Sequence, residues 1–265
     1  DYDREKMNIK HKITEWIKTY ATDAGIETLV VGVSGGIDSA VVSTLCAETG
    51  MDTIVLSMPI RQKPAQHDLS VDHCLNLVEH YTNVHWETVD LTETFEQLEN
   101  TFTNTRYNSE LSFANTRSRL RMLTLYQIAG STNGIVVGTG NRVEDFGVGF
   151  YTKYGDGGVD ISPIADLTKT EVWDLGSELG VDQRIIDAQP TDGLWDDGRV
   201  DQDQLGGLSY PQLEQAMRLD ELRSNTQSAE PVVQFEAHEE RLLEAYHRIR
   251  KPNLHKMMPI PVFKK

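Results

Sequence analysis

The sequence is poor in cysteine, in long apolar runs and in positive charge. Its two cysteines, Cys46 and Cys74, are too few for a disulfide framework or a four-thiolate zinc site, and both fall in apolar helical patterns where we expect core packing. No stretch of eighteen apolar residues occurs, so we expect no membrane-spanning helix. The charged segment 1–10 lacks the apolar centre of a secretory signal. These absences indicate a reduced, cytoplasmic setting.

The shortage of positive charge limits the partners. Lysine and arginine total 25 against 41 aspartates and glutamates, which gives a net charge of −16. Such a chain should not bind nucleic acid through a general basic surface, and an anionic substrate would need a local basic island. The acidic excess would suit a salt-rich cytosol, although solubility alone also explains it.

Apolar runs alternate with amphipathic segments over the first 140 residues, and 38% hydrophobic content in 265 residues is enough for one packed domain over 1–265. The alternation predicts an α/β fold, a doubly wound parallel sheet with flanking helices. We expect strands at 28–33, 53–58, 84–89 and 134–138, and helices at 3–20 (within an N-terminal helical segment 1–22), 39–49, 65–80, 91–99 and 109–130.

Beyond residue 140 the periodicity weakens. We expect an irregular glycine-rich stretch at 141–161, helices at 168–180 and 229–250, and a C-terminal tail over 252–265 that contains proline. Residues 190–209 hold glycine, aspartate and glutamine with little core material, which predicts a mobile loop beside the active site.

The most informative segment is 32–39 (GVSGGIDS), between the first buried strand and a helix. Gly35 and Gly36 allow positive φ and close approach of a ligand, while the free N–H groups of the helix start and the hydroxyls of Ser34 and Ser39 point into the same space. The segment lacks the Lys-Ser/Thr of a Walker A loop and the G-x-G-x-x-G of a dinucleotide fingerprint. It predicts an oxyanion cradle in which Asp38 needs a bridging Mg²⁺. The alternative is a tight turn with Asp38 as a helix cap.

Three further features suggest a site. Arg117, Arg119 and Arg121 form a basic island on a predicted helix, unless they are a solvated face with salt bridges. Thr139 follows a buried strand, where open α/β sheets bind ligands, and Glu144 is a candidate second metal ligand or an exposed loop acid. Lys153 and Asp160 flank a glycine-rich stretch, 155–158, which is either a ligand loop or a flexible one.

These segments together resemble a known family. The loop 34–39 alone is similar to the pyrophosphatase loop of the N-type ATP pyrophosphatases, whose fold is adenine nucleotide alpha hydrolase-like, or Rossmann-like. The whole ordered set resembles ammonia-dependent NAD synthetase and covers about residues 28–263: 34–39 (SGGIDS), 115–122 (NTRSRLRM), 136–139 (VVGT), 150–160 (FYTKYGDGGVD), 167–170 (LTKT), 189–191 (QPT), 205–210 (LGGLSY) and 255–256 (HK).

The resemblance implies a ligase that amidates deamido-NAD with ammonia, splitting ATP into AMP and pyrophosphate through an acyl-adenylate. It implies Mg²⁺ on Asp38 and Glu144, and catalytic roles for Asp38, Lys169 and Asp160, the last as a binder of ammonium. The implied ATP contacts are Gly32, Val33, Ser34, Gly35, Gly36, Ile37, Asp38, Ser39, Thr139, Lys169 and Thr191. The implied deamido-NAD contacts are Arg119, Lys153, Asp160, His255 and Lys256.

In this family the two residues at 255–256 can reach a twofold-related subunit, so the resemblance also implies a homodimer. Two departures weaken the loop and tail contacts: Asp192-Gly193 stands where Ala-Asp is more frequent, and Met257-Met258 where a basic pair is frequent. Arg61 and Gln66 are weaker candidates for contacting adenine.

Other functions remain open at this point. A GMP synthetase half would share the loop but lack the 150–160 segment, and a tRNA thiolase would want paired cysteines and a basic RNA face. A non-catalytic adenine-nucleotide sensor would have little reason to keep Asp38, Glu144 and Lys153 together. Because the match spans nearly all 265 residues, we expect free ammonia as the nitrogen source, with a separate glutaminase subunit as an alternative.

Overall fold

The computed structural model describes residues 8–226 and 234–265. Its centre is a parallel sheet of β3 (Val84–Thr88), β2 (Asp52–Ser57), β1 (Thr28–Gly32) and β4 (Gly134–Val136), in that spatial order. The register sets Thr28 opposite both Asp52 and Gly134. The chain therefore builds outward from β1 to β3 and then crosses to the other side of β1. In an open parallel sheet, the carboxyl ends of the two strands at such a reversal, here β1 and β4, border the usual ligand crevice.

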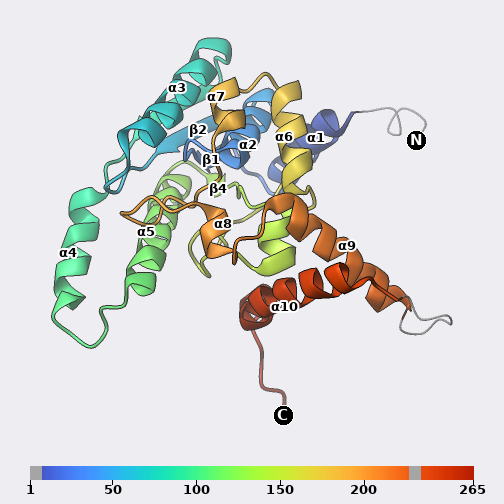
Figure 1. Cartoon of the computed structure of the whole chain (residues 1–265). Helices are drawn as coiled ribbons and strands as arrows, with labels where there is room; N and C mark the ends of the chain where they lie inside the picture. Colours follow the sequence, from blue (N-terminus) through green and yellow to red (C-terminus); the bar gives the residue numbers. More distant parts are fainter. Residues whose placement is uncertain (1–7, 227–233) are drawn as a thin grey trace.

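Helices cover both faces of the sheet (Figure 1). One face packs against α1 (Ile9–Asp23), α2 (Ile37–Glu48), α6 (Lys169–Glu178) and α7 (Gln183–Asp187), and the other against α4 (Thr92–Thr103) and α5 (Glu110–Ser131). Helix α3 (Pro64–His80) packs on β2 and β3. Successive β1 residues alternate between the faces: Leu29 and Val31 lie in the first core and Val30 in the second. The sheet is thus buried on both sides, and the predicted α/β class is confirmed.

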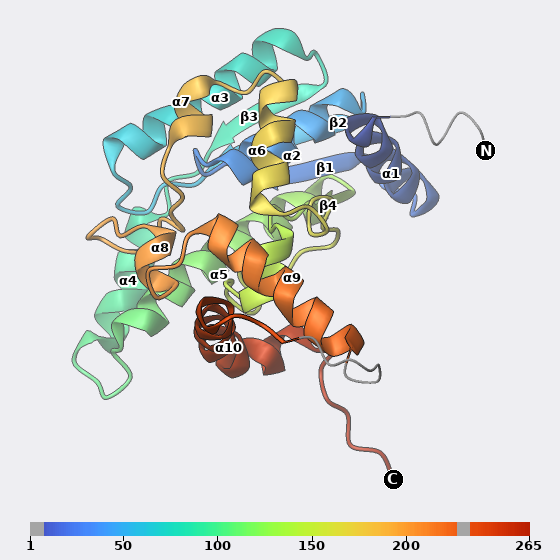
Figure 2. The same cartoon turned by 45° about the vertical axis from the view of Figure 1, so that its right-hand side comes forward.

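A separate apolar cluster lies at the carboxyl-terminal end of the chain. It joins the π-helical turn η1 (Val143–Val148) to α8 (Asp201–Gln204), α9 (Tyr210–Thr226) and α10 (Ala237–Met257). Leu213 and Tyr246 are among its buried members. Figure 2 shows α9 and α10 together at the end of the molecule opposite α3.

Agreement with the sequence prediction is close before residue 140 and poorer after it. The N-terminal helix begins at Ile9, because the Asn8 side chain caps it by accepting a hydrogen bond from Lys10 N at 2.7 Å; the predicted residues 3–7 lie outside the described part. Helix α4 runs four residues further than predicted. The segments predicted as irregular, 141–161 and 190–209, contain η1 and α8.

Near the C-terminus one helix was missed and one prediction was wrong. Helix α9 was not predicted, and α10 continues through Pro252 to Met257 where we expected a tail. Tertiary contacts hold this last turn despite the proline: Asn253 Nδ2 donates to Val148 O at 3.0 Å, and Tyr151 Oη donates to Lys256 O at 2.8 Å. The helix predicted at 229–250 falls partly on residues outside the described part.

Two absences expected from the sequence concern the described residues. Neither cysteine forms a disulfide there, and both thiols are buried. Across 8–226 and 234–265, no helix has the length and apolar character needed to span a bilayer.

Candidate active site

The glycine loop after β1 is fixed by its own serines. Ser39 Oγ accepts a hydrogen bond from Ser34 N at 3.0 Å and donates to Gly36 O at 3.2 Å. Gly35 adopts φ +91°, and a Cβ there would lie 2.5 Å from Gln66 O, so only glycine fits. Gly36 is the N-cap residue of α2 and supplies no side-chain cap. The first N–H groups of α2 are therefore left for another acceptor.

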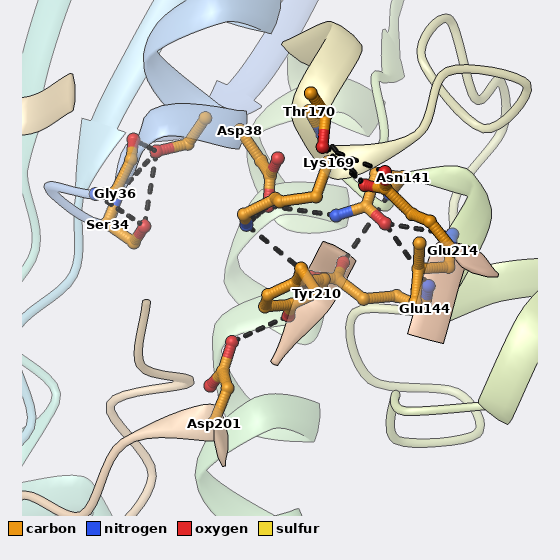
Figure 3. A network of polar contacts seen from close by, with 12 residues as sticks. Ser34, Gly36, Asp38, Asn141, Glu144, Lys169, Thr170, Asp201, Tyr210 and Glu214 are labelled. Carbon is orange, nitrogen blue, oxygen red and sulfur yellow. Dashed lines mark hydrogen bonds and ion pairs between the residues drawn. The ribbon is translucent and has the colours of Figure 1, made fainter. Parts of the chain in front are cut away.

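Asp38 is a first-turn residue of α2, and its carboxylate does not cap that helix. Its Oδ2 lies 2.6 Å from Lys169 Nζ and accepts a longer hydrogen bond, 3.4 Å, from Asn141 Nδ2 (Figure 3). Its Oδ1 is buried and has no hydrogen-bond partner in the described residues. The cap interpretation of Asp38 is therefore wrong, and the side chain is directed at residues from the other side of the β1–β4 crevice.

Lys169 is the first residue of α6 and is 3% exposed. Its ammonium lies 3.8 Å from Glu144 Oε1 and 4.7 Å from the centre of the Tyr210 ring. Burial alone would lower the pKa of Lys169, but the carboxylates of Asp38 and Glu144 raise it above its usual value. The lysine is thus a permanent positive charge inside the site.

Three carboxyl groups, those of Asp38, Glu144 and Asp201, lie around the single ammonium of Lys169. Tyr210 Oη lies 2.9 Å from Glu144 Oε1 and 2.7 Å from Asp201 Oδ2. Burial, and then the negative charge of Asp38, raises the pKa of Glu144 well above its ordinary range, and burial raises that of Asp201 to about 6. Burial is the main cause of both shifts, and a bound cation would favour the charged form of each carboxyl.

The oxygen donors of the site fit a Mg²⁺ ion that is coordinated jointly by the protein and by a bound phosphate. No group of three or more His, Cys, Asp or Glu side chains suited to a metal occurs in the described part of the chain. Mg²⁺ commonly takes only one or two protein carboxylates and completes its shell with water and phosphate oxygens. The unpartnered Oδ1 of Asp38, with Glu144 close by, matches that pattern.

These groups line a cavity of about 450 Å³ at the carboxyl edge of the sheet. All residues predicted for ATP and metal border it: those at 32–39, together with Thr139, Glu144, Lys169 and Thr191. Arg61, Gln66 and Arg121 also border it, as do residues of the predicted loop, including Asp192, Trp195 and Asp201. The sequence prediction and the structure thus place one set of residues around one space.

The residues predicted for deamido-NAD lie outside that lining. Arg119 is exposed, and its Nε donates to Lys153 O at 3.1 Å. Both oxygens of Asp160 accept hydrogen bonds, Oδ2 from Val136 N at 2.7 Å and Oδ1 from Tyr126 Oη at 3.0 Å. The structure therefore separates these residues from the lysine–carboxylate cluster, and their role stays a prediction.

The two predicted C-terminal contacts lie on the last turns of α10. Lys256 Nζ donates to Tyr151 O, and burial lowers the pKa of this lysine. His255 is exposed. Both residues remain candidates for a surface outside the cavity.

Sequence reasoning missed several polar residues of the site. Asn141 was not singled out, yet its Oδ1 accepts hydrogen bonds from Val143 N and Glu144 N and so fixes the turn that presents Glu144. Tyr210 was quoted in a motif without a role. Of the three arginines of the predicted basic island, Arg121 borders the cavity, whereas Arg117 is buried and paired with Asp196 at 2.7 Å. The island stays a prediction. The spacing of Asn141 and Glu144 after a strand end was the available signal.

A glycine loop after a central parallel strand, faced by a lysine and carboxylates across the crevice, defines an α/β protein of the adenine nucleotide alpha hydrolase-like class. The family model described as NAD synthase matches residues 9–259, and the chain belongs to that family. The predicted family, fold class and type of enzyme, a carbon–nitrogen ligase, are confirmed.

Relatives agree with this assignment. The chain is 40% identical to the NH(3)-dependent NAD(+) synthetase of Alkaliphilus metalliredigens (74% of this chain, 80% of the relative) and 38% identical to that of Carboxydothermus hydrogenoformans (74% and 79%). Among solved structures it is similar to an NMN synthetase from Francisella tularensis, with TM-score 0.81, 30% identity and coverage of 97% and 98% of the two chains. It shares the fold of the NH3-dependent NAD synthetase from Campylobacter jejuni, with TM-score 0.75, 23% identity and coverage of 97% and 100%.

Proposed function

We propose that this chain amidates deamido-NAD with ammonia and converts ATP to AMP and pyrophosphate. One observation carries the proposal: the Lys169–Asp38 pair faces a glycine loop whose helix-start N–H groups lack a side-chain cap, inside one cavity. The names of the curated relatives support NAD as the product and ammonia as the nitrogen source. ATP is the nucleotide that the loop would receive.

The chemistry requires an activated carboxylate. The pyridine carboxylate oxygen attacks the α-phosphorus of ATP, the α–β phosphoanhydride bond breaks, and pyrophosphate leaves. The ammonia nitrogen then attacks the acyl carbon, AMP departs with the bridging oxygen, and the nitrogen loses a proton. Negative charge develops on the leaving pyrophosphate, so Lys169 and the loop N–H groups would stabilise this stage most.

Asp38 and Glu144 would hold Mg²⁺. When bound, the ion would neutralise phosphate charge. The residues of this chain determine where it could sit, because Asn141 fixes the turn that carries Glu144 and Lys169 holds Oδ2 of Asp38. The free Oδ1 of Asp38 is the oxygen left for a metal.

Arg119, Lys153, Asp160, His255 and Lys256 are proposed to contact deamido-NAD, some of them from a twofold-related subunit. The exposed side chains of Arg119, Asp160 and His255 and the family resemblance support this. Light scattering or sedimentation would measure the homodimer. We also propose that 190–209 is a mobile loop beside the active site. Several of its residues border the cavity, which supports its place beside the site. The proposed location of the protein is cytoplasmic.

An alternative candidate for the acceptor is nicotinic acid mononucleotide. The structural likeness to an NMN synthetase, at 30% identity over nearly the full length of both chains, favours it specifically. Both acceptors carry the same pyridine carboxylate, so the same activation applies to either.

The test measures pyrophosphate, AMP and amide product with each acceptor and with ammonium or glutamine as nitrogen source. We expect ammonium-dependent NAD formation. Asp38→Ala should lower turnover by about 10²-fold or more with an unchanged circular dichroism spectrum, because it removes the proposed Mg²⁺ ligand and the carboxylate that holds Lys169. Asp23→Ala, an exposed acid at the end of α1, is the matched control. AMP formation that needs neither acceptor, or normal turnover in Asp38→Ala, would contradict the proposal.

A further inference from the structure

Lys169 lies in the first turn of α6, and a residue of α9 forms hydrogen bonds with that turn. Thr168 caps α6 by accepting a hydrogen bond from Glu171 N, and Glu171 Oε2 accepts from Thr168 N at 2.8 Å. This reciprocal pair fixes the residues on either side of Lys169 but leaves the N–H of Thr170 without an acceptor in α6.

Glu214, on the second turn of α9, takes up that N–H. Its Oε1 accepts from Thr170 N at 2.9 Å, and its two oxygens lie 3.0 and 2.8 Å from Thr170 Oγ1 (Figure 3). The residue is 6% exposed, and within the described part of the chain its side-chain hydrogen bonds go to neutral groups of Thr170, next to Lys169. A buried carboxylate needs such hydrogen bonds, and the positive end of α6 favours its charge.

The same helix also reaches Lys169 from its other side. Tyr210 and Glu214 are four residues apart, so both project from one face of α9. The Tyr210 ring lies 4.7 Å from the ammonium, while Glu214 holds the backbone one residue along. Helix α9 therefore contacts the charged tip of Lys169 through Tyr210 and the backbone of the next residue, Thr170, through Glu214.

We propose that Glu214 is a positioning residue for Lys169. By fixing Thr170 through two hydrogen-bond donors, it sets where the ammonium meets the phosphate site. This rests on the proposed function for its kinetic effect, but the placement of the side chain does not depend on it. Oε1 lies within hydrogen-bond distance of both Thr170 N and Thr170 Oγ1, so one acceptor oxygen at this position can serve both donors.

Four variants test the proposal. Glu214→Ala should lower kcat about 10- to 100-fold, because small displacements of a charged catalytic group are costly, and leave KM for deamido-NAD within about twofold. Glu214→Gln keeps an acceptor oxygen and should stay within about threefold of the wild type. Thr170→Val removes one donor and should fall between them. Glu221→Ala is the matched control, an acid of α9 that pairs with Arg142 on the surface.

A crystal structure of each variant supplies a readout that needs no activity. The Lys169 Nζ to Asp38 Oδ2 distance of 2.6 Å should lengthen in Glu214→Ala and persist in Glu214→Gln. An unmoved lysine, equal losses in the Gln and Ala variants, or an equal loss in Glu221→Ala would overturn the positioning role. If the Glu214→Ala protein fails to fold, Thr170→Val against Thr170→Ser gives the same comparison. A wild type with no amide product would refute the proposed function, and the distances would still decide the role of Glu214.

Discussion

The two walls of the cavity are built in different ways. The phosphate-loop wall comes from one contiguous segment, 32–39, shaped by its own backbone and serines. The opposite wall gathers single side chains from η1, α6 and α8, namely Glu144, Lys169 and Asp201, and Tyr210 of α9 packs against all three. A short motif can specify the first wall, whereas the second exists only when four separate elements pack correctly. The first should therefore fail through local steric change, and the second through changes in charge or packing.

Of three further changes that compare the walls, Gly35→Ala in the phosphate-loop wall should have the largest effect. The added Cβ would meet Gln66 O, and the residue would keep a positive φ, so we expect more than tenfold weaker ATP binding and about 1–3 kcal/mol lower stability. Calorimetry and urea unfolding measure the two quantities. Gly50→Ala is the control, since its φ is also positive at +74° but nothing lies near its Cβ. Equal ATP affinity in both variants would contradict the steric account.

Two buried carboxyl groups, Asp201 in the opposite wall and Asp145 in η1, should make stability depend on pH. The pKa of Asp201 is raised to about 6, and that of Asp145 to about 7, both mainly by burial. Between about pH 4 and pH 7 the folded state holds protons that the unfolded chain has released, so the free energy of unfolding should fall as pH rises through that window.

Asp201→Asn tests this directly. It should raise stability at pH 7.5 by about 1–3 kcal/mol, leave it nearly unchanged at pH 4, and flatten the pH profile. Urea unfolding at constant ionic strength gives the profile, with Asp23→Asn as the exposed control. A parallel shift at all pH values would show that the charge of Asp201 is not the cause.

The smallest effect concerns the loop that joins the two walls. Asp196 reaches Arg117 at 2.7 Å and Arg61 at 3.5 Å, but its side chain is 59% exposed. Asp196→Ala should therefore cost less than about 1 kcal/mol of stability and speed amide hydrogen exchange within 190–200 by several-fold. Asp197→Ala serves as the control because Asp197 pairs with Arg199 inside the same segment. Identical exchange in the two variants would show that Asp196 does not hold the loop.

The sequence allowed prediction of the sheet and of the phosphate-loop wall, because both depend on local patterns. Continuous apolar runs are typical of strands buried on both faces, and the motif S-G-G-x-D-S predicts the turn that it forms between β1 and α2. Helix α9 was missed, because exposed charged residues dilute its apolar pattern and its inward residues pack against η1 and α10 rather than the sheet.

Side-chain partners across the cavity were also beyond the sequence. Lys169 and Asp38 are 131 residues apart, and Asp38 alone looked equally compatible with a cap. Arg117 appeared free for ligand, yet the structure pairs it with Asp196 and stacks its guanidinium 4.6 Å from the centre of the Phe95 ring. Such pairings depend on how distant segments meet, which no local spacing encodes.

The ammonium of Lys169 serves as a built-in counter-ion for Asp38. A divalent ion bound at Asp38 as proposed would share that carboxylate with Lys169, and this sharing would weaken the binding of metal alone. A polyphosphate gives the lysine an alternative partner and frees the oxygen it occupies. Metal and nucleotide should consequently assist each other's entry, so the affinity for either measured alone understates what the pair achieves together.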